Sequence, residues 1–474
     1  MTKVLLIEPP PVTEVSTMRV LGSIGSTKAD ISWPPYDIMI IGGLLRKHGI
    51  DFKLIDANNL RISFSELKKI IKKEKPELVV FTVAPITLAS DAKTAETAKS
   101  VSKKIKTFAV NLSLQGVKDL DKVFAKYKDL DVIAYGEPEL PVLNFINSNY
   151  NPKKVLGIYY RIGGRIVKNR PQPPENLDEL GTPVHDLVPF KLYHDPLMKR
   201  RPMTIACTSR GCVNMCIYCA SKFQRPVRYR SVENVMKEIR LIRSLGIKEI
   251  KFFDCTFTNN LVWVEKFLRE LIKEKIDITW SCDVRADRLP PKIIKLMKAA
   301  GCHTICVGSD SADQKILDNI KKNVTVKQIE DAVKNVKKEG LRILLYFTFG
   351  HPGETRESIR KSIEFAKRMN PDLVTFGIIV PVYNTEFYDY LEKNGLLLNM
   401  KSSDYDTSKP PAYSYPHLSS EEIYGLVMQG YREFYLRPSF MLKRLTNSNS
   451  LRYEFNNFRF FVKRYVIEPM KKTS

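Results

Sequence analysis

Cysteine is absent from the first 206 residues of the chain and from every position after Cys306. All eight cysteines of the 474 residues therefore lie in one middle stretch, and four of them fall between Cys207 and Cys219. A secreted domain held together by disulfides spreads its cysteines through a short chain. The tight group found here indicates instead a metal site or a catalytic site.

Long apolar runs and acidic residues are also scarce. The N-terminus begins with a single apolar run, Val4–Ile7, which is too short for the core of a signal peptide or for a membrane span. We therefore expect a cytoplasmic protein, with peripheral contact to the anionic face of the cytoplasmic membrane left open. The 76 Lys and Arg residues outnumber the 52 Asp and Glu residues and give a net charge of +24. This excess favours anionic partners such as nucleic acid, acidic lipid or phosphorylated molecules.

Residues 1–150 alternate between short apolar runs and helical patterns. One helical pattern opens at Ser63 with Glu66 three residues later, which is the spacing of a capping box. Repeated units of this kind predict a Rossmann-like parallel sheet with helices on both faces, whose ligands lie beyond the carboxyl ends of the strands. No G-x-G-x-x-G follows the first strand, so a dinucleotide site has little support. The expected strands are Lys3–Glu8, Asp51–Ala57, Leu78–Ala84, Thr107–Leu112 and Asp131–Tyr135.

A hairpin and a linker are predicted over residues 151–200. Leu156–Val167 alternates around Gly163–Gly164, which is a hairpin signal, and the stretch after it is rich in proline and acidic residues. A second alternating region follows over residues 201–400, and residues 401–474 are predicted to be mostly helical. The six strands expected in the second region are Thr204–Cys207, Glu249–Asp254, Ile278–Asp283, Thr304–Val307, Arg342–Phe349 and Leu373–Val380.

Cys212, Cys216 and Cys219 stand in GCVNMCIYC, with the spacing C-x₃-C-x₂-C. Three thiolates this close together can converge on one metal centre. A [4Fe–4S] cluster normally takes four thiolates, so three leave one iron open to a small molecule, which suits binding and cleavage of a ligand. The alternative is a zinc site in which Cys207 supplies the fourth thiolate, but its offset of five residues is not typical of a zinc knuckle.

The full motif, C-x₃-C-x-aromatic-C with Tyr218 at the aromatic position, resembles the signature of the radical S-adenosylmethionine (SAM) superfamily. In that family three cysteines hold a [4Fe–4S] cluster whose open iron is chelated by the amino and carboxylate groups of SAM. One electron then cleaves SAM to a 5′-deoxyadenosyl radical, which abstracts hydrogen from the substrate. The resemblance covers residues 1–400. It implies a partial (β/α)₆ barrel over residues 201–400 and an external one-electron reductant of the ferredoxin or flavodoxin type.

Several stretches at the ends of the expected barrel strands resemble the family's SAM contacts. Asp254 lies in FDCTF after the second strand, and Arg285 lies in WSCDVRAD after the third. Arg285 suits the SAM carboxylate because a guanidinium grips a carboxylate with two parallel hydrogen bonds. Gly308–Ser311 resembles a G-x-E-S turn, with an aspartate where glutamate is usual. The resemblance thus implies SAM contacts at Tyr218, Asp254, Arg285, Ser309 and Asp310.

The Rossmann-like unit before the barrel resembles the cobalamin-binding-domain class of the superfamily. The matching stretches include Trp33–Tyr36 and Gly136–Glu139. None of the six histidines forms the D-x-H-x-x-G motif that ligates cobalt in many cobalamin domains, so cobalamin is implied by the domain pattern rather than by a ligand. The alternative is a cobalamin-like fold that only organises substrate. The candidate cobalamin contacts are Trp33, Pro85, Ser113, Gly136 and Glu137.

Two stretches are strongly basic. Lys199–Arg230, which encloses the cysteine motif, holds eight basic residues and no acidic ones. Leu436–Ser474 holds nine Lys and Arg residues against two Glu, interleaved with seven aromatic residues. Such a tail suits an interfacial helix on anionic lipid, nucleic-acid binding, or helices packed on the barrel with basic outer faces. Tyr431–Leu445 resembles the C-terminal region of class members that modify lipids, such as hopanoid methylases.

The leading hypothesis is a cobalamin-dependent radical SAM enzyme that modifies an unactivated carbon by methylation, cyclisation or carbon–carbon coupling. A membrane or isoprenoid lipid, including archaeal ether lipid, is the favoured substrate. Two alternative enzymatic functions are the modification of a peptide or small natural product and the modification of nucleic acid. The second is favoured only by the positive charge of the chain. A cobalamin or redox sensor without catalytic activity belongs to a different class, and it predicts a filled cluster without SAM cleavage.

Overall fold

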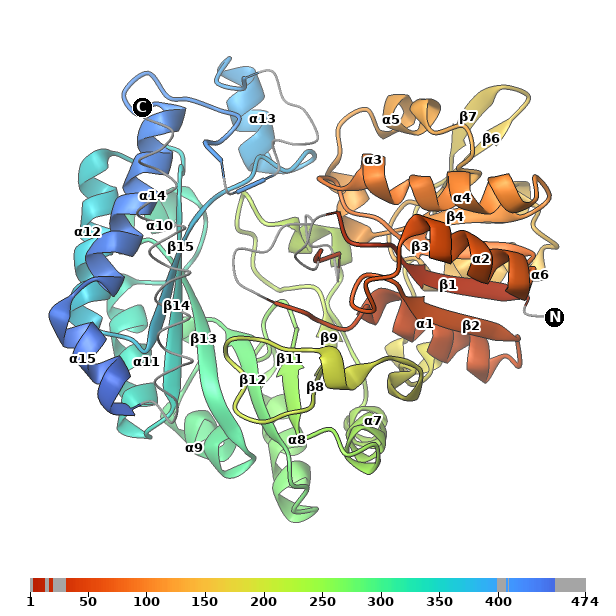
Figure 1. Cartoon of the computed structure of the whole chain (residues 1–474). Helices are drawn as coiled ribbons and strands as arrows, with labels where there is room; N and C mark the ends of the chain where they lie inside the picture. The colour runs from red at the N-terminus through yellow and green to blue at the C-terminus, as the bar shows by residue number, and fades with distance from the viewer. Residues whose placement is uncertain (1–2, 13–16, 20–30, 399–405, 408, 448–474) are drawn as a thin grey trace.

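The computed structural model describes residues 3–12, 17–19, 31–398, 406–407 and 409–447. Within them the chain forms two α/β units that lie side by side, each built on its own sheet (Figure 1). The first unit, red to yellow in Figure 1, holds a seven-stranded sheet, and the second, green to blue, holds a six-stranded sheet. The α/β fold class predicted from the sequence is confirmed.

The first sheet has the strand order β2-β1-β3-β4-β5-β6-β7, and its first five strands in the chain run parallel. Most of their residues are buried because helices cover both faces of the sheet, which is why the sequence shows continuous apolar runs rather than alternation. The parallel strands are Val4–Glu8 (β1), Phe52–Asp56 (β2), Leu78–Thr82 (β3), Lys106–Val110 (β4) and Val132–Ala134 (β5).

The helices of the first unit divide between the two faces of its sheet. Helices α1 (Tyr36–Lys47) and α6 (Glu139–Asn147) share one apolar core with the sheet. Helix α2 begins after Ser63, whose side chain and that of Glu66 form the predicted capping box. The opposite core is formed by α2 (Phe64–Glu74), α3 (Leu88–Asp91), α4 (Lys93–Val101) and α5 (Leu120–Lys126).

The predicted hairpin extends the first sheet instead of standing apart in the linker. Strand β6 (Ile158–Ile162) pairs antiparallel with β5, and β7 (Arg165–Lys168) pairs antiparallel with β6. The linker that follows packs on α1. A Cβ atom on Gly43 of α1 would lie 2.3 Å from the carbonyl oxygen of Thr182, so the close approach of the two segments requires glycine. Its short 3₁₀ turns are η4 (Leu177–Leu180), η5 (His185–Leu187) and η6 (Phe190–Leu192).

The second sheet has its six strands in chain order, all parallel, with helices between them. This is the partial barrel that the family resemblance implies. Its strands are β8 (Met203–Ala206), β11 (Glu249–Phe252), β12 (Thr279–Val284), β13 (Cys302–Asp310), β14 (Arg342–Phe349) and β15 (Leu373–Ile378). Its main helices are α7 (Val232–Ser244), α8 (Leu261–Lys273), α9 (Pro291–Ala299), α11 (Val326–Lys338), α12 (Arg356–Met369) and α14 (Ser420–Tyr435).

The two units share apolar contacts along the first barrel strand. Met203, Ile205 and Cys207 belong to the core that α1 and α6 build in the first unit. At the other end of the chain, only the part of Leu436–Ser474 up to Asn447 is described, as α15 (Pro438–Asn447), so most of the basic tail lies outside the described residues. Among the described helices, none combines the length and the apolar character needed to cross a bilayer.

Candidate active site

One cavity of about 510 Å³ lies at the carboxyl ends of the barrel strands. Its far wall comes from Leu112 and Ser113, which belong to the 3₁₀ turn η2 (Leu112–Gly116) of the first unit. Both units therefore border the same space. Of the residues predicted from the sequence, the cavity is lined by Ser113, Cys212, Cys216, Tyr218, Cys219, Asp254, Arg285 and Asp310.

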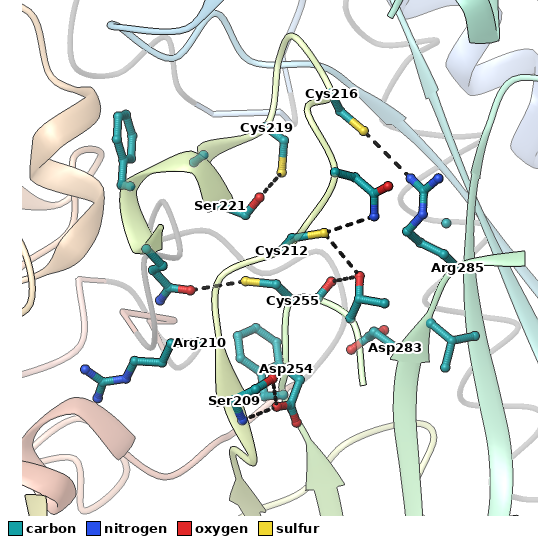
Figure 2. Close-up of a pocket in the computed structure, with 18 of the residues that line it drawn as sticks. Ser209, Arg210, Cys212, Cys216, Cys219, Ser221, Asp254, Cys255, Asp283 and Arg285 are labelled. Atoms are coloured by element: carbon teal, nitrogen blue, oxygen red, sulfur yellow. Dashed lines mark hydrogen bonds between the residues drawn. The ribbon is translucent and has the colours of Figure 1, made fainter. Parts of the chain in front are cut away.

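The cysteine loop runs between strand β9 (Ser209–Arg210) and the turn η7 (Ala220–Gln224). Figure 2 shows the three thiols of the motif around the cavity. Asn214 donates a hydrogen bond to Sγ of Cys212 at 3.4 Å, and the Cys219 thiol donates to Oγ of Ser221 at 3.2 Å. Three thiols of one loop that open to one cavity fit a [4Fe–4S] cluster with one iron left open.

The zinc alternative would require Cys207 to join the motif. Its thiol is buried and instead donates to the carbonyl oxygen of Phe253 at 3.5 Å. Among the residues that the structure describes, no three Cys, His, Asp or Glu side chains converge on a single ion. A cubane does not need such convergence, because each cysteine holds a different iron.

Asp254 leaves one carboxylate oxygen free for a ligand. Its Oδ1 accepts hydrogen bonds from the backbone N–H and hydroxyl groups of both Thr208 and Ser209, at 2.6 to 3.0 Å. Its Oδ2 is buried and has no hydrogen-bond partner among the described residues. Burial raises the pKa of this carboxyl group to about 6. A buried acceptor without a partner is costly, so the site favours a ligand that donates a hydrogen bond, such as an ammonium group.

Arg285 is fixed by its own neighbours and turned toward the cysteine loop. Its Nε donates to Asp287 at 2.9 Å, and one of its terminal nitrogens donates to the carbonyl oxygen of Lys322 at 2.6 Å. The other terminal nitrogen lies 4.0 Å from Sγ of Cys216. A guanidinium in this place can pair with an anionic group bound beside the cysteines.

Asp310 is already occupied by neighbours that the sequence did not reveal as partners. It accepts a hydrogen bond from the Tyr218 hydroxyl at 2.6 Å and forms an ion pair with the buried Lys322. Burial opposes ionisation, but the Lys322 charge outweighs it and holds the pKa of Asp310 below its usual range. Lys322 precedes the helix α11 and carries no motif, so only the fold brings it to the site.

Ser309 stands apart from the other predicted SAM contacts. It is fully buried and is not among the residues that line the cavity, whereas Gly308 and Asp310 on either side of it are. Alternate residues of a strand point to opposite faces, and β13 runs through all three positions. The strand alternation in the sequence was therefore a signal that separates Ser309 from its neighbours.

The comparisons with known proteins agree with this geometry. Residues 207–366 match the model of the radical SAM superfamily. A protein of Pyrococcus horikoshii named as an uncharacterized methyltransferase is 32% identical, over 98% of this chain and 97% of its own length. The chain belongs to the radical SAM superfamily. Family membership confirms the expected [4Fe–4S] cluster and SAM, and it confirms that the protein is an enzyme.

Two solved structures have a fold similar to that of this radical SAM protein. The cobalamin-dependent SAM radical enzyme OxsB, solved with aqua-cobalamin and SAM bound, covers 98% of this chain and 72% of its own, with a TM-score of 0.76 and 16% identity. The radical SAM methyltransferase TsrM of Kitasatospora setae covers 83% of this chain and 75% of its own, with a TM-score of 0.67 and 15% identity. The architecture of the radical SAM chain is thus that of the cobalamin-dependent class.

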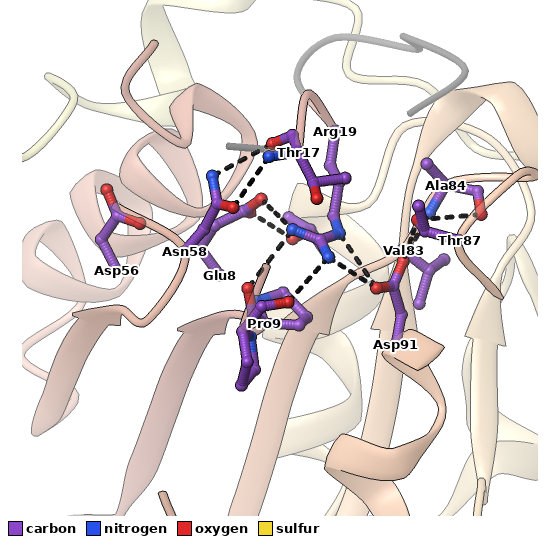
Figure 3. A network of polar contacts seen from close by, with 12 residues as sticks. Glu8, Pro9, Thr17, Arg19, Asp56, Asn58, Val83, Ala84, Thr87 and Asp91 are labelled. Atoms are coloured by element: carbon purple, nitrogen blue, oxygen red, sulfur yellow. Dashed lines mark hydrogen bonds and ion pairs between the residues drawn. The ribbon is translucent and has the colours of Figure 1, made fainter. Parts of the chain in front are cut away.

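The carboxyl edge of the first sheet, where cobalamin contacts were expected, is partly filled by the chain itself. The guanidinium of Arg19 lies wholly buried between Glu8 and Asp91, with ion-pair distances of 3.1 and 2.7 Å (Figure 3). It also donates to the carbonyl oxygens of Pro9 and Pro10. In this radical SAM chain the Arg19 guanidinium therefore lies at the carboxyl ends of β1 and β3.

The candidate cobalamin residues lie in different places. Ser113 lines the cavity, and its N–H and hydroxyl both donate to Asn111. Trp33 donates to Asp195 at 2.8 Å and packs edge-on against the cavity residue Phe253, with ring centroids 4.9 Å apart. Pro85 is buried in the loop after β3, and Gly136 lies against the side chain of Gln115 in η2.

The Glu137 carboxylate is paired with two arginine side chains of the barrel unit. Its buried carboxylate forms ion pairs with Arg210 and Arg228, and Glu139 pairs with Arg210 as well. Burial raises the pKa of Glu137, but the two guanidinium groups outweigh it and hold the value below normal. Because Arg210 lies two residues before Cys212, the network joins the cysteine loop to the first unit. The structure therefore gives Glu137 a positioning role, and its contact with cobalamin stays a prediction.

Only some of the basic residues of Lys199–Arg230 lie at the surface. Of its eight basic residues, Arg210, Arg228 and Arg230 are buried, and Arg230 forms an ion pair with Glu238. Sequence composition cannot separate buried from exposed charges, because the acidic partners lie outside the stretch. The surface part includes Lys199, Arg201 and Lys222.

A polar layer inside the barrel was also missed. Lys251 of β11 is buried and forms an ion pair with Asp283 of β12 at 2.8 Å, while the Tyr346 hydroxyl of β14 donates to the same carboxylate at 3.2 Å. Asp283 and Tyr346 line the cavity. A lysine between Ile250 and Phe252 of a buried strand was the signal for this layer, since a buried charge needs a partner.

We expect Glu137→Gln to destabilise the protein by about 3 kcal/mol, because removing one partner leaves buried guanidinium charge without compensation. Denaturant unfolding would measure this, and iron content after reconstitution should fall with it. The matched control is Glu392→Gln. Glu392 bridges the two units through Lys118, but both side chains are about half exposed, so the cost should stay within about 1 kcal/mol. Equal effects of the two variants would contradict the assignment.

The pKa of Asp254 predicts an unusual pH dependence. A buried carboxyl group with a folded pKa of about 6, above the usual aspartate pKa of 3.8, favours folding below pH 3.8 and loses this contribution as pH rises through about 6. Asp254→Asn removes the buried charge. In cluster-free protein the variant should therefore gain stability relative to wild type between pH 5 and pH 8, by on the order of 2 kcal/mol. Unfolding curves at the two pH values measure the gain, and a pH-independent difference would contradict it.

Proposed function

We propose that this protein binds cobalamin beside its cluster and SAM, and that it methylates or cyclises a membrane or isoprenoid lipid at an unactivated carbon. The observation that carries the proposal is the single cavity that joins the three motif thiols to the η2 wall of the first unit. The cluster ligands and the wall from the first unit therefore border one continuous space. A volume of about 510 Å³ also falls within the ordinary range for ligand sites.

The chain's own residues have separate roles around SAM. The motif thiols hold the cluster, the free Oδ2 of Asp254 accepts from the amino group, and Arg285 pairs with the carboxylate. Their partners in the barrel fix these side chains before SAM binds, which lowers the ordering cost of binding. The cluster and SAM together would supply the 5′-deoxyadenosyl radical that abstracts hydrogen from the substrate.

The cobalamin assignment is supported by the first unit's fold and by its open wall. Since Arg19 closes the crevice above β1 and β3, the group would be held over η2, near Leu112 and Ser113. There it would supply a transferable methyl group, or it would serve in ring formation. Relatives are named for both outcomes. The Pyrococcus horikoshii protein is named as a methyltransferase, and an anaerobic magnesium-protoporphyrin IX monomethyl ester cyclase of Rubrivivax gelatinosus is 25% identical over 89% of this chain and 77% of its own length.

The lipid substrate is supported by the walls of the cavity and by the charge of the chain. Leu112, Phe223, Phe253 and Val284 present apolar surface to the cavity. The net charge of +24 favours anionic headgroups, and peripheral contact with an anionic membrane fits the same charge. An apolar wall next to the radical site suits a hydrocarbon chain that offers no hydrogen-bonding group.

The electron donor is proposed to be a ferredoxin or a flavodoxin. The cysteine loop exposes Val213 and Met215, with 45% and 53% of their surface accessible, and Lys222 lies exposed just beyond Cys219. Apolar residues flanked by positive charge, directly above the cluster ligands, suit the docking of an acidic carrier. The path from the donor to the cluster is then a few residues long.

Anaerobic reconstitution tests the chemistry. Wild-type protein should be brown, hold about four irons per chain and release 5′-deoxyadenosine from SAM on reduction. Cys216→Ala should lose that product entirely, because one iron held by the motif then lacks its ligand. Product release would be measured by chromatography. A cluster-loaded wild type that releases no product would favour the sensor interpretation.

Lipid analysis tests the substrate. Deletion of the gene in its native host should remove lipid species that carry an extra methyl group or ring, and wild-type protein supplied in trans should restore them. Mass spectrometry of total lipid extracts would detect the change, with Cys216→Ala supplied in trans as the control. An unchanged lipid profile alongside active SAM cleavage would reject the lipid substrate and leave the reaction class intact.

A further inference from the structure

Besides the three motif cysteines, Cys255 and Cys207 also line the cavity. Cys255 follows Asp254 at the carboxyl end of β11 and lines the same space as Cys212, Cys216 and Cys219 (Figure 2). All eight cysteines lie in the described part of the chain, and among them only Cys255 is exposed to solvent. The thiol is therefore accessible from the cavity, unlike the cysteines buried in the barrel.

Three consecutive residues connect this segment to the cysteine loop. Oδ1 of Asp254 accepts from Ser209, just ahead of the loop, and Oγ1 of Thr256 lies 3.6 Å from Sγ of Cys212. Between them the Cys255 thiol donates to Oε1 of Gln224 at 3.1 Å. The same oxygen accepts from the N–H of Gly211 at 3.2 Å, directly before Cys212. The segment and the loop therefore keep a fixed spacing.

Exposure and hydrogen bonding separate Cys255 from Cys207. Cys255 is exposed and lines the cavity together with Cys212 and Cys219. Cys207 borders the same cavity, but it is buried, and its thiol donates to the carbonyl oxygen of Phe253 at 3.5 Å. Beside Cys255, the unpartnered Oδ2 of Asp254 is buried at the cavity, which independently indicates that a ligand binds at this spot.

We propose that Cys255 is a displaceable fourth ligand, which binds the open iron of the cluster when SAM is absent. The inference rests on the proposed function, since it requires the cluster. On binding, the thiol leaves Gln224, loses its proton to solvent and forms an iron–sulfur bond. When SAM arrives, that bond breaks, the thiolate regains a proton, and the amino and carboxylate groups of SAM take its place. No electron is exchanged in either direction.

The consequence is protection of the cluster between turnovers. A cluster held by three thiolates exposes one labile iron, whereas four thiolates cover every corner. The resting enzyme would therefore keep its fourth iron until SAM displaces Cys255. The displacement also lowers the affinity for SAM, because the bond between the iron and Cys255 must break before SAM can chelate that iron.

Iron retention tests the proposal in the full-length reconstituted protein. Wild type, Cys255→Ala and the control Cys302→Ala would be oxidised with ferricyanide without SAM, and the [3Fe–4S] signal followed by electron paramagnetic resonance. Cys302 is buried in the barrel, and its thiol contacts the carbonyl oxygen of Thr304. Cys255→Ala should convert severalfold faster than the other two proteins, and it should bind SAM severalfold more tightly. Equal conversion rates in all three proteins would overturn the proposal.

A second measurement needs no variant. Iodoacetamide labelling followed by peptide mass spectrometry should modify Cys255 in cluster-free wild type and leave it unmodified in cluster-loaded, SAM-free wild type. Labelling of Cys255 in the loaded protein would also overturn the proposal. Failure of the three motif cysteines to hold any cluster is a different result, since it would reject the proposed function itself.

Discussion

The buried ion pairs between Glu137, Arg210 and Arg228 hold the site together. They bring a loop of the first sheet against the strand that leads into the cysteine loop, and they do so with charges removed from water. Burying a single charge is expensive, but each of these charges faces an opposite one, so the arrangement persists only when both units are in place. The common cavity follows from this constraint, because it places the ends of both sets of strands at one space.

The same charges show why composition misleads about surfaces. Eight basic residues without an acidic one predict a positive face, yet three of them are buried beside glutamates that lie outside the stretch. Arg19 is a parallel case in the first unit, where it is buried between two carboxylates. In each case the neutralising partner arrives through the fold. The net charge therefore overstates the positive potential that a partner would meet around the cysteine motif.

Most of the fold could be predicted from local sequence patterns. The buried strands of both sheets appear as continuous apolar runs, and the capping box at Ser63 depends on residues three apart, so the sequence contains them directly. The cysteine loop was equally visible because its ligands lie within eight residues. Lys322 was not visible, because only the fold brings it to Asp310, and the partner of Lys251 is likewise chosen by strand packing. The hairpin was predicted, but its pairing with β5 is a long-range choice that no local pattern encodes.

The apolar contacts of β8 with the first unit have a dynamic consequence. Met203, Ile205 and Cys207 are part of the first unit's core. Separating the two units would therefore expose apolar surface to water, at a free-energy cost proportional to the exposed area. A hinge at this seam is therefore disfavoured. A large molecule would therefore enter the cavity past peripheral segments rather than by opening of this seam.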